Sequence, residues 1–520
     1  MKISIPMTSF TPRPAAPRAP RRALCALSSV LCALSLSGCM VGPKYHPPAP
    51  PQIAAQNYKE STVNFQDQPG WKVANPNAPM LQGNWWEVFH EPELNSLEDQ
   101  LNIDNQTIRQ YFSQYMEARA LVAEARAQFW PTLTFSPSWN RQRTSANLRS
   151  STYANTGATS TIWEAPLDAS WSPDIWGKIR REVQSAEYAA QVSAADLAGE
   201  KLTEQASLAE YYFEIRGQDE LQVILNQTVA ADKAALSATQ GAYDAGTGDY
   251  IAVVQARTTL ESAQSAATAV GLARAQYEHA IAVLLGKVAT DFSIPVRPMT
   301  YTPPPIPVGV PSELLERRPD VAAAERTLAE ANATIGIGYG AFFPQVTLSA
   351  AGGTETSNIA HIADWPSRFW SLGASASQIV FDAGLYRAEL HQYQAAYNAD
   401  LASYRQTSLT AFQQVEDALV ATRNDSLQIL EERQAVRDSQ QYLDMEMQRY
   451  KTGVDPYVDV TIAQTTLLSD QQVLNTLQVS GMMSAVELVQ ALGGGWNLSQ
   501  LPTPSQAGSQ PPSSVYSLQK

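Results

Sequence analysis

The chain has 520 residues, three cysteines, five histidines and a formal net charge of −14. This length exceeds what one hydrophobic core usually holds, and the acidic balance argues against nucleic-acid binding. The histidines are scattered, and we find no phosphate-binding loop, zinc-protease motif or nucleophile elbow. We therefore predict no catalytic residue, no metal site and no cofactor.

Residues 1–38 have the pattern of a secretory signal peptide. Two arginines precede an apolar run that ends in Leu36–Cys39, and this run is too short to be a spanning helix. The Leu-Ser-Gly-Cys ending resembles a bacterial lipobox, which implies that Cys39 becomes the first mature residue and carries N-acyl and S-diacylglycerol lipid. Cys25 and Cys32 would leave with the signal, so no disulfide remains. An ordinary signal peptide ending near Cys39 is the alternative.

Residues 39–84 are predicted to form a lipidated tether, because five prolines between residues 43 and 51 favour an extended chain. The first of two structural repeats follows at residues 85–290. It begins with a predicted helix from Glu93 to Gln128, which has apolar residues at helical spacing and no internal Gly or Pro.

A β-hairpin is predicted at residues 131–172, where the apolar period changes to two after Pro131. The alternating apolar residues are Leu133, Phe135 and Trp139 on the first arm, and Trp163, Ala165, Leu167, Ala169 and Trp171 on the second. An apolar row with tryptophan at both ends is typical of a transmembrane strand with aromatic girdles. This hairpin alone is equally compatible with a soluble sandwich.

Residues 175–241 lack proline and predict a nearly continuous helix of roughly 65 residues, or ~100 Å. Two separate apolar stripes indicate a helix with a neighbour on each side, as in the wall of a cylinder. A long two- or four-helix bundle is the alternative. Glycine and proline are expected to turn the chain near 246 and near 453, and the predicted turn residues are Gly246, Gly248, Gly453 and Pro456.

A self-match indicates that the chain is an internal duplication. Between 243 and 264, ten of 22 residues are identical to those found 207 positions later, and a match at a fixed period indicates a repeat. A Pro-rich strap at residues 291–312 precedes the second repeat, residues 313–496. Residues 497–520 are polar and Pro-rich, and we predict a flexible tail.

The second repeat contains a second predicted hairpin at residues 344–381. Its alternating apolar residues are Val346, Leu348 and Ala350, then Trp370, Leu372, Ala374 and Ala376. Four strands cannot close a barrel, and an open sheet edge is not tolerated in lipid. Two chains would give eight strands with a filled interior, whereas three give twelve strands and a lumen. The predicted membrane girdle is Trp139, Trp163, Trp171 and Trp370.

Short motifs along residues 39–496 together resemble the TolC-like outer membrane efflux proteins, in the lipoprotein branch typified by OprM and NodT. The motifs are Gly38–Tyr45, Trp85-Trp86 with Phe89, Trp171–Gly177 with Arg180-Arg181, Ala209 with Tyr212-Phe213, Gln276–Ala280, Leu285-Gly286, Glu316–Val321 and Phe343-Pro344. None is decisive alone, but their order within a duplication is highly specific.

The resemblance implies an α+β membrane protein that forms a homotrimer. A 12-stranded transmembrane β-barrel, with four strands per chain, would continue into a 12-helix periplasmic α-barrel with an equatorial domain. The implied activity is passive export of drugs or other small toxic molecules, and hence a role in multidrug resistance. Cargo would come from an inner-membrane pump of the resistance-nodulation-division or major-facilitator type through a periplasmic adaptor. The alternative is a lipid-anchored periplasmic coiled-coil scaffold without a pore.

The family's second helical turn lies at a periplasmic aperture, and this assigns roles to three residues here. The resemblance makes Tyr450 a constriction contact, and Asp455 and Asp459 acidic groups near the aperture. The sequence departs from the TolC pattern at Ile462, where a second pore Asp would fall, and at Asp455, where TolC has an Arg. A simple turn role before Pro456 is the alternative for Asp455.

The first helical turn is expected to lie on the outside of the implied α-barrel. Asp244 and Asp249 flank this turn, and they are the predicted docking candidates for the adaptor. The implied location is the outer membrane, both lipid-anchored and spanning, with a large periplasmic part. The absence of Asp after Cys39 agrees with outer-membrane retention.

Overall fold

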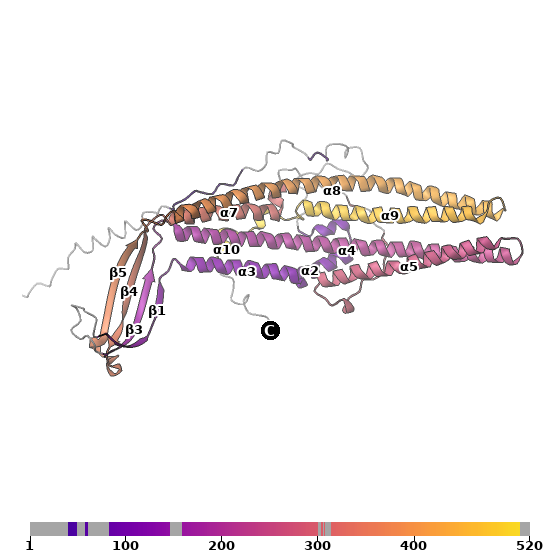
Figure 1. Ribbon diagram of the computed structural model, residues 1–520. Coiled ribbons are helices and arrows are strands. Elements are labelled where there is room, and N and C mark those ends of the chain that lie inside the picture. Colours follow the sequence, from indigo (N-terminus) through magenta and orange to yellow (C-terminus); the bar gives the residue numbers. More distant parts are fainter. Residues whose placement is uncertain are drawn as a thin grey trace, which may run out of the picture. The chain divides into compact units, whose positions relative to one another are not determined.

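The computed structural model describes residues 40–48, 58–60, 83–145, 159–299, 303–304, 306 and 314–509. Cys39, the predicted signal peptide and most of the predicted tether lie outside this part. The described residues form two compact units. We call residues 40–42, 129–181 and 339–380 the sheet unit, and the remaining described residues the helical unit (Figure 1).

The sheet unit is antiparallel, with strand order β1-β3-β4-β5 and with β2 also paired to β3. The strands are β1 (Thr132–Phe135), β2 (Ser138–Arg143), β3 (Thr159–Trp171), β4 (Gln345–Thr356) and β5 (Arg368–Ser377). Short 3-10 turns at Ile359–His361 and Trp365–Ser367 connect β4 to β5.

β1 and β2 are two parts of one arm. Phe135 lies opposite Leu167 and Ser138 lies opposite Glu164, so the register continues without a shift across the gap between them. Pro137 lies in that gap, and proline has no N–H group for the ladder. The sheet therefore has four arms although five strands are assigned.

The helical unit is dominated by four long helices in two pairs. Helices α4 (Lys178–Asp244) and α8 (Leu385–Lys451) have 67 residues each, and α5 (Tyr250–Leu284) and α9 (Tyr457–Ala491) have 35 each. The other helices are α2 (Pro92–Asp104), α3 (Gln106–Ala127), α6 (Leu314–Arg317), α7 (Pro319–Gly340) and α10 (Pro504–Ala507). Three-residue or five-residue 3-10 turns lie at Trp85–Phe89, Ala289–Asp291 and Leu498–Gln500.

Helix α4 is continuous, as the absence of proline allowed, and α7 and α9 lie along one line between α4 and α8 (Figure 1). No helix among the described residues is both long and apolar enough to cross a membrane.

The helix predicted from Glu93 to Gln128 is instead two helices, because Asn105 interrupts it. The Asn105 side chain accepts a hydrogen bond from the Ile108 N–H at 2.8 Å and so caps α3. Its amide nitrogen donates to the Leu284 carbonyl at 2.9 Å and to Glu204 at 3.1 Å. The predicted helix rested on the absence of Gly and Pro. In the structure α2 ends at Asn105, a buried residue whose side chain has partners in other helices.

The main core of the helical unit gathers around the aromatic 3-10 turn Trp85–Phe89. The rings of Phe89 and Phe213 lie 5.1 Å apart, and those of Trp85 and Trp86 are 5.9 Å apart. Buried residues of α2, α4, α8 and α9 join the same core. Aromatic residues with large buried areas thus fasten this segment to the long helices.

A buried ion network binds α4 to α5 and to the start of the predicted strap. Arg216 is fully buried and pairs with Glu93 at 2.7 Å and with Asp219 at 2.9 Å. Asp219 also accepts from Arg274 at 2.7 Å, and Arg274 donates to the Ile294 carbonyl at 2.7 Å. Buried charges need partners of this kind.

Residues 498–509, within the predicted flexible tail, are held by contacts with α3 and α4. Ala507 packs with Val122 and Ala190 in a small buried cluster. Arg126 donates to the Gly508 carbonyl at 2.7 Å, and Gln191 donates to the Pro502 carbonyl at 2.8 Å. The polar composition of the predicted tail did not indicate these contacts. Residues 510–520 lie outside the described part.

Candidate functional site

The two helical turns have the same backbone design. Gly246 and Gly453 have φ values of +69° and +74°, a left-handed conformation that glycine adopts without steric cost. The Gly246 N–H donates to the Tyr243 carbonyl at 2.9 Å, and the Gly453 N–H donates to the Tyr450 carbonyl at 3.0 Å. These bonds close α4 and α8 in the same way.

The other two predicted turn residues have different roles. A Cβ added to Gly248 would lie 3.0 Å from the Cβ of Ala242, so a larger residue would crowd the end of α4. Pro456 is the N-cap residue of α9 and provides no side-chain cap, whereas Asp249 accepts from the Ile251 N–H at 3.1 Å and caps α5. Asp244 is exposed and accepts from Gln240 at 2.8 Å.

A tyrosine pair closes each turn. The ring centroids of Tyr243 and Tyr250 are 5.3 Å apart, and those of Tyr450 and Tyr457 are also 5.3 Å apart. Tyr243 and Tyr250 are exposed, but Tyr457 is only 5% exposed. Tyr457 belongs to a buried cluster, here called the tip core, whose members are Ala235, Ala256, Tyr457 and Val460. The tip core therefore joins the α4–α5 hairpin to the α8–α9 hairpin.

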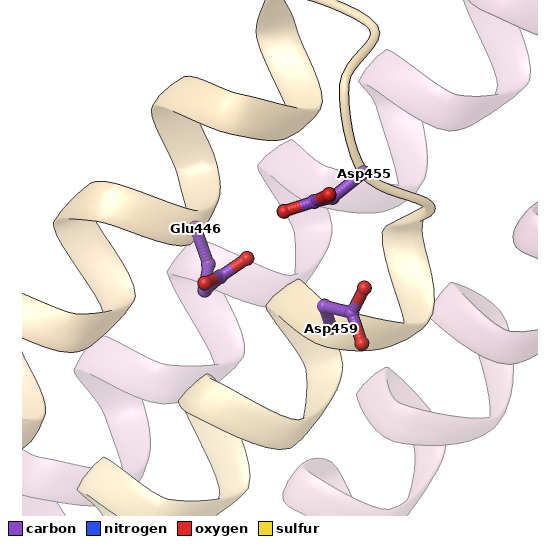
Figure 2. Close-up of side chains that lie close together, drawn as sticks. All are labelled: Glu446, Asp455 and Asp459. Atoms are coloured by element: carbon purple, nitrogen blue, oxygen red, sulfur yellow. The ribbon is translucent and has the colours of Figure 1, made fainter.

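The second turn alone carries an ionic cluster, here called the tip cluster, formed by Glu446, Arg449, Asp455 and Asp459. Figure 2 shows Glu446, Asp455 and Asp459 pointing toward one another from α8, the turn and α9. One carboxylate oxygen of each residue lies within 4.8 Å of those of the other two. The residues 207 positions earlier are Thr239, Ala242, Gly248 and Ala252. The chemical difference between the turns thus lies in side chains and not in the backbone.

Arg449 neutralises part of the tip cluster. Its Nη2 donates to Asp455 Oδ1 at 3.0 Å, and its Nε lies 4.0 Å from Glu446 Oε2. The hydrogen bond from Arg449 lowers the pKa of Asp455 below its usual range, and the same bond raises the pKa of Arg449. Asp455 is therefore ionised and paired at neutral pH.

The sequence predicted aperture roles for Asp455 and Asp459 but not for Arg449 and Glu446, which lie beside them in the structure. The signal that could have found them is the antiparallel hairpin itself, which brings the last turn of α8 beside the first turn of α9. Tyr450, the predicted constriction contact, packs on Tyr457 of the same chain. Within the described residues, no other trio of acidic, histidine or cysteine side chains lies close enough to share a metal ion.

In the sheet unit, the register gathers the alternating apolar residues on one face, here called the apolar face. Trp139 lies opposite Trp163, Trp171 opposite Leu348, and Leu348 opposite Ala374, and directly paired residues point to the same side of a sheet. The face consists of Leu133, Phe135, Trp139, Trp163, Ala165, Leu167, Ala169, Trp171, Val346, Leu348, Ala350, Trp370, Leu372, Ala374 and Ala376. All four predicted girdle tryptophans are on it.

Much of this face is exposed in the single chain. Trp370 is 79% exposed and Leu372 is 76% exposed. The opposite face is polar and includes Glu164, which lies directly opposite Glu355. Within the described residues, β1 and β5 each pair on one side only, so both edges of the sheet remain open. Contiguous exposed apolar residues of this kind usually mark an interaction surface.

Comparisons with known proteins match this architecture. The family model of outer membrane efflux proteins matches residues 97–287 and 310–494. The chain is similar to the solvent efflux pump outer membrane protein SrpC of Pseudomonas putida, with 31% identity over 472 residues that cover 90% of this chain and 97% of SrpC.

A second relative and a solved structure agree. The antibiotic efflux pump outer membrane protein ArpC of Pseudomonas putida is 29% identical over 473 residues, covering 90% of this chain and 95% of ArpC. The solved structure of the outer-membrane channel OprN superposes with a TM-score of 0.80 and 27% identity, covering 88% of this chain and 100% of OprN.

Proposed function

The chain belongs to the outer membrane efflux protein family, and from this premise we propose that it is the passive export duct of a tripartite efflux system and not an enzyme. It acts in efflux at the outer membrane, as its relatives do. The cargo would be drugs, solvents or other small toxic molecules, in line with the antibiotic and solvent efflux pumps to which SrpC and ArpC belong.

The observation that carries the proposal is the exposed apolar face with tryptophans at its ends. Lipid would cover this face, and other copies of the chain would pair with the open edges of β1 and β5, because unpaired backbone groups are not tolerated in a bilayer. Four arms per chain make twelve strands in a homotrimer, which leaves a lumen. The four long helices per chain would likewise make a 12-helix α-barrel, as expected if the chain is a duplication.

A lipid-facing sheet also favours a pore over the alternative of a periplasmic coiled-coil scaffold, because such a scaffold does not require a membrane-spanning sheet. The partners would be an inner-membrane pump of the resistance-nodulation-division or major-facilitator type and a periplasmic adaptor. Asp244 and Asp249 flank the first helical turn, which is exposed and has no ionic cluster like that of the second turn. We propose this first turn as the adaptor-docking site.

We also propose that Cys39 carries the lipid of a bacterial lipoprotein. The support is the Leu-Ser-Gly-Cys ending alone. The intact mass of the purified mature protein measures this directly: the proposal fails if the mass corresponds to an unmodified N-terminus, or if Cys39→Ala has the wild-type lipid mass.

The tip cluster is the proposed aperture element. Three copies around an axis would place Glu446, Asp455 and Asp459 close together, and their excess negative charge would attract cations. Arg449 would hold each turn compact through its pair with Asp455. Loss of the two aspartates should therefore both loosen the turn and weaken cation preference.

Planar-bilayer recordings test the duct and its aperture together. Wild-type protein, purified in its assembled form, should form small channels that prefer cations. The double variant Asp455→Ala/Asp459→Ala should have a higher conductance or open probability. The matched control is Asp244→Ala with Asp249→Ala at the first turn, which should leave conductance unchanged. Correctly assembled protein that forms no channels would contradict the proposed duct. Channels whose conductance does not change when Asp455 and Asp459 are replaced would contradict only the aperture assignment.

A further inference from the structure

Asp232 is a buried carboxyl group that the export duct does not require. It lies on α4, is only 2% exposed, and its Oδ2 has no hydrogen-bond partner among the described residues. Buried polar atoms are almost always paired, so an orphan carboxylate oxygen calls for an explanation. Its burial is produced by this chain itself, without a neighbouring copy.

Asp232 lies beside the tip core. Burial raises the pKa of Tyr457 to about 12, and the negative charge of Asp232 is the second cause of that shift, so the two groups are close. Ala235 and Leu236, one turn further along α4, pack in or against the tip core. The acid thus stands where one helical hairpin meets the other.

The hydrophobic residues that meet Ala235 and Leu236 at this contact come from three other helices. Ala252 and Ala256 come from α5, Val460 comes with Tyr457 from α9, and the residues of α8 are Leu443, Met447 and Tyr450. The only titratable groups among them are the two tyrosines. Burial alone raises the pKa of Asp232 to about 6, with no contribution from a charged neighbour.

We propose that Asp232 is a proton-binding site that couples proton uptake to the packing of the α4–α5 hairpin against the α8–α9 hairpin. In its neutral form the side chain fits the apolar contact. In its ionised form it places an unpaired charge there, which favours separation of the hairpins and hydration of the carboxylate. This site is distinct from the exposed tip cluster.

The direction of the pH effect follows from proton linkage. The packed state raises the pKa of Asp232, so it binds more protons than the separated state. The packing of the two hairpins is therefore strengthened as pH falls through about 6 toward the usual pKa range of an aspartate. The packing is weakest above about pH 7. The Arg449–Asp455 pair has the opposite pH dependence. The pKa of Asp455 is lowered, so acid weakens this pair, and it does so only at a pH below the usual range of an aspartate.

Hydrogen exchange on the purified full chain tests this coupling. Peptides covering residues 232–236 and 457–460 would be compared at about pH 5 and about pH 7.5, after correction for intrinsic exchange. Wild-type peptides should exchange at least several-fold more slowly at the lower pH, whereas Asp232→Asn should exchange slowly at both. Asp438→Asn, an exposed acid of α8, is the control and should behave as wild type.

Infrared difference spectroscopy supplies an independent readout. In the difference between wild type and Asp232→Asn, a protonated-carboxyl band should be present at low pH and disappear with a midpoint near pH 6. Wild-type exchange that does not change with pH overturns the proposal without any variant. A pH response that persists in folded Asp232→Asn also overturns it. Because the readout is hairpin packing in the protein itself, failure here leaves the export proposal standing.

Discussion

Two arginines of the helical unit, Arg449 and Arg216, meet carboxylates in very different surroundings. The Arg449 side chain is more than half exposed, and water screens its pair with Asp455. Arg216 is fully buried, and it pairs with the buried Asp219 and with the partly exposed Glu93. Asp219 would keep Arg274 if Arg216 were lost, but removal of a buried charge partner still costs more than removal of an exposed one.

Arg216→Met should destabilise the helical unit by about 3–5 kcal/mol, because Asp219 and Glu93 lose a buried partner. Its counterpart 207 residues later, Arg423, is partly exposed and pairs with Glu60 at 2.9 Å. Arg423→Met should change stability by no more than about 1 kcal/mol. Urea unfolding followed by circular dichroism measures both, and equal losses would contradict the role given to burial.

At the scale of elements, the helices follow local rules except where distant residues intervene. The absence of proline allows α4 and α8 to run for 67 residues each, and positive φ at a glycine ends each of them. The break at Asn105 needed partners from α4 and α5. The predicted helix from Glu93 was wrong at that point because neither partner is near in sequence.

Two glycines near the end of α4 should respond to alanine with opposite signs. Gly246 has φ of +69°, so Gly246→Ala should destabilise the turn by about 1–2 kcal/mol. Gly241 lies within α4, and a Cβ added there would meet no atom within 4 Å, so Gly241→Ala should stabilise α4 by about 0.5–1 kcal/mol. Exchange rates of the peptides around the turn give both values, and the same sign for both variants would refute the assignment.

At the scale of the whole molecule, the sheet unit has one exposed apolar face and, among the described residues, two open edges. The apolar face is continuous only because β1, β2, β3, β4 and β5 share one register. A single chain leaves β1 and β5 unpaired on their outer sides among the described residues. Folding of this sheet and assembly of the protein are therefore expected to be coupled.

Adjacent residues of β5 should separate the two faces experimentally. Leu372 lies on the apolar face and Ser371 on the polar face. Leu372→Arg should lower the yield of assembled protein in outer membranes, since a lipid-facing arginine costs about 2–4 kcal/mol near the bilayer midplane. Ser371→Arg should assemble normally. The amount of folded oligomer in the membrane fraction measures both effects. Equal amounts for the two variants would indicate that the apolar face does not contact lipid.

The sequence by itself determined the features that depend on local period and on repetition. Alternation predicted which side of each strand is apolar, and the missing prolines predicted the long helix, because both patterns are read within one element. The resemblance then predicted the family, which the comparisons confirmed.

The tertiary structure alone decided the features in which distant residues meet. Arg449 neutralises Asp455 across a turn, Asn105 ends α2 through partners in α4 and α5, and Asp232 becomes buried beside Tyr457 of another hairpin. Burial and pairing depend on three-dimensional neighbours, and these in turn set which carboxyl group is ionised at neutral pH.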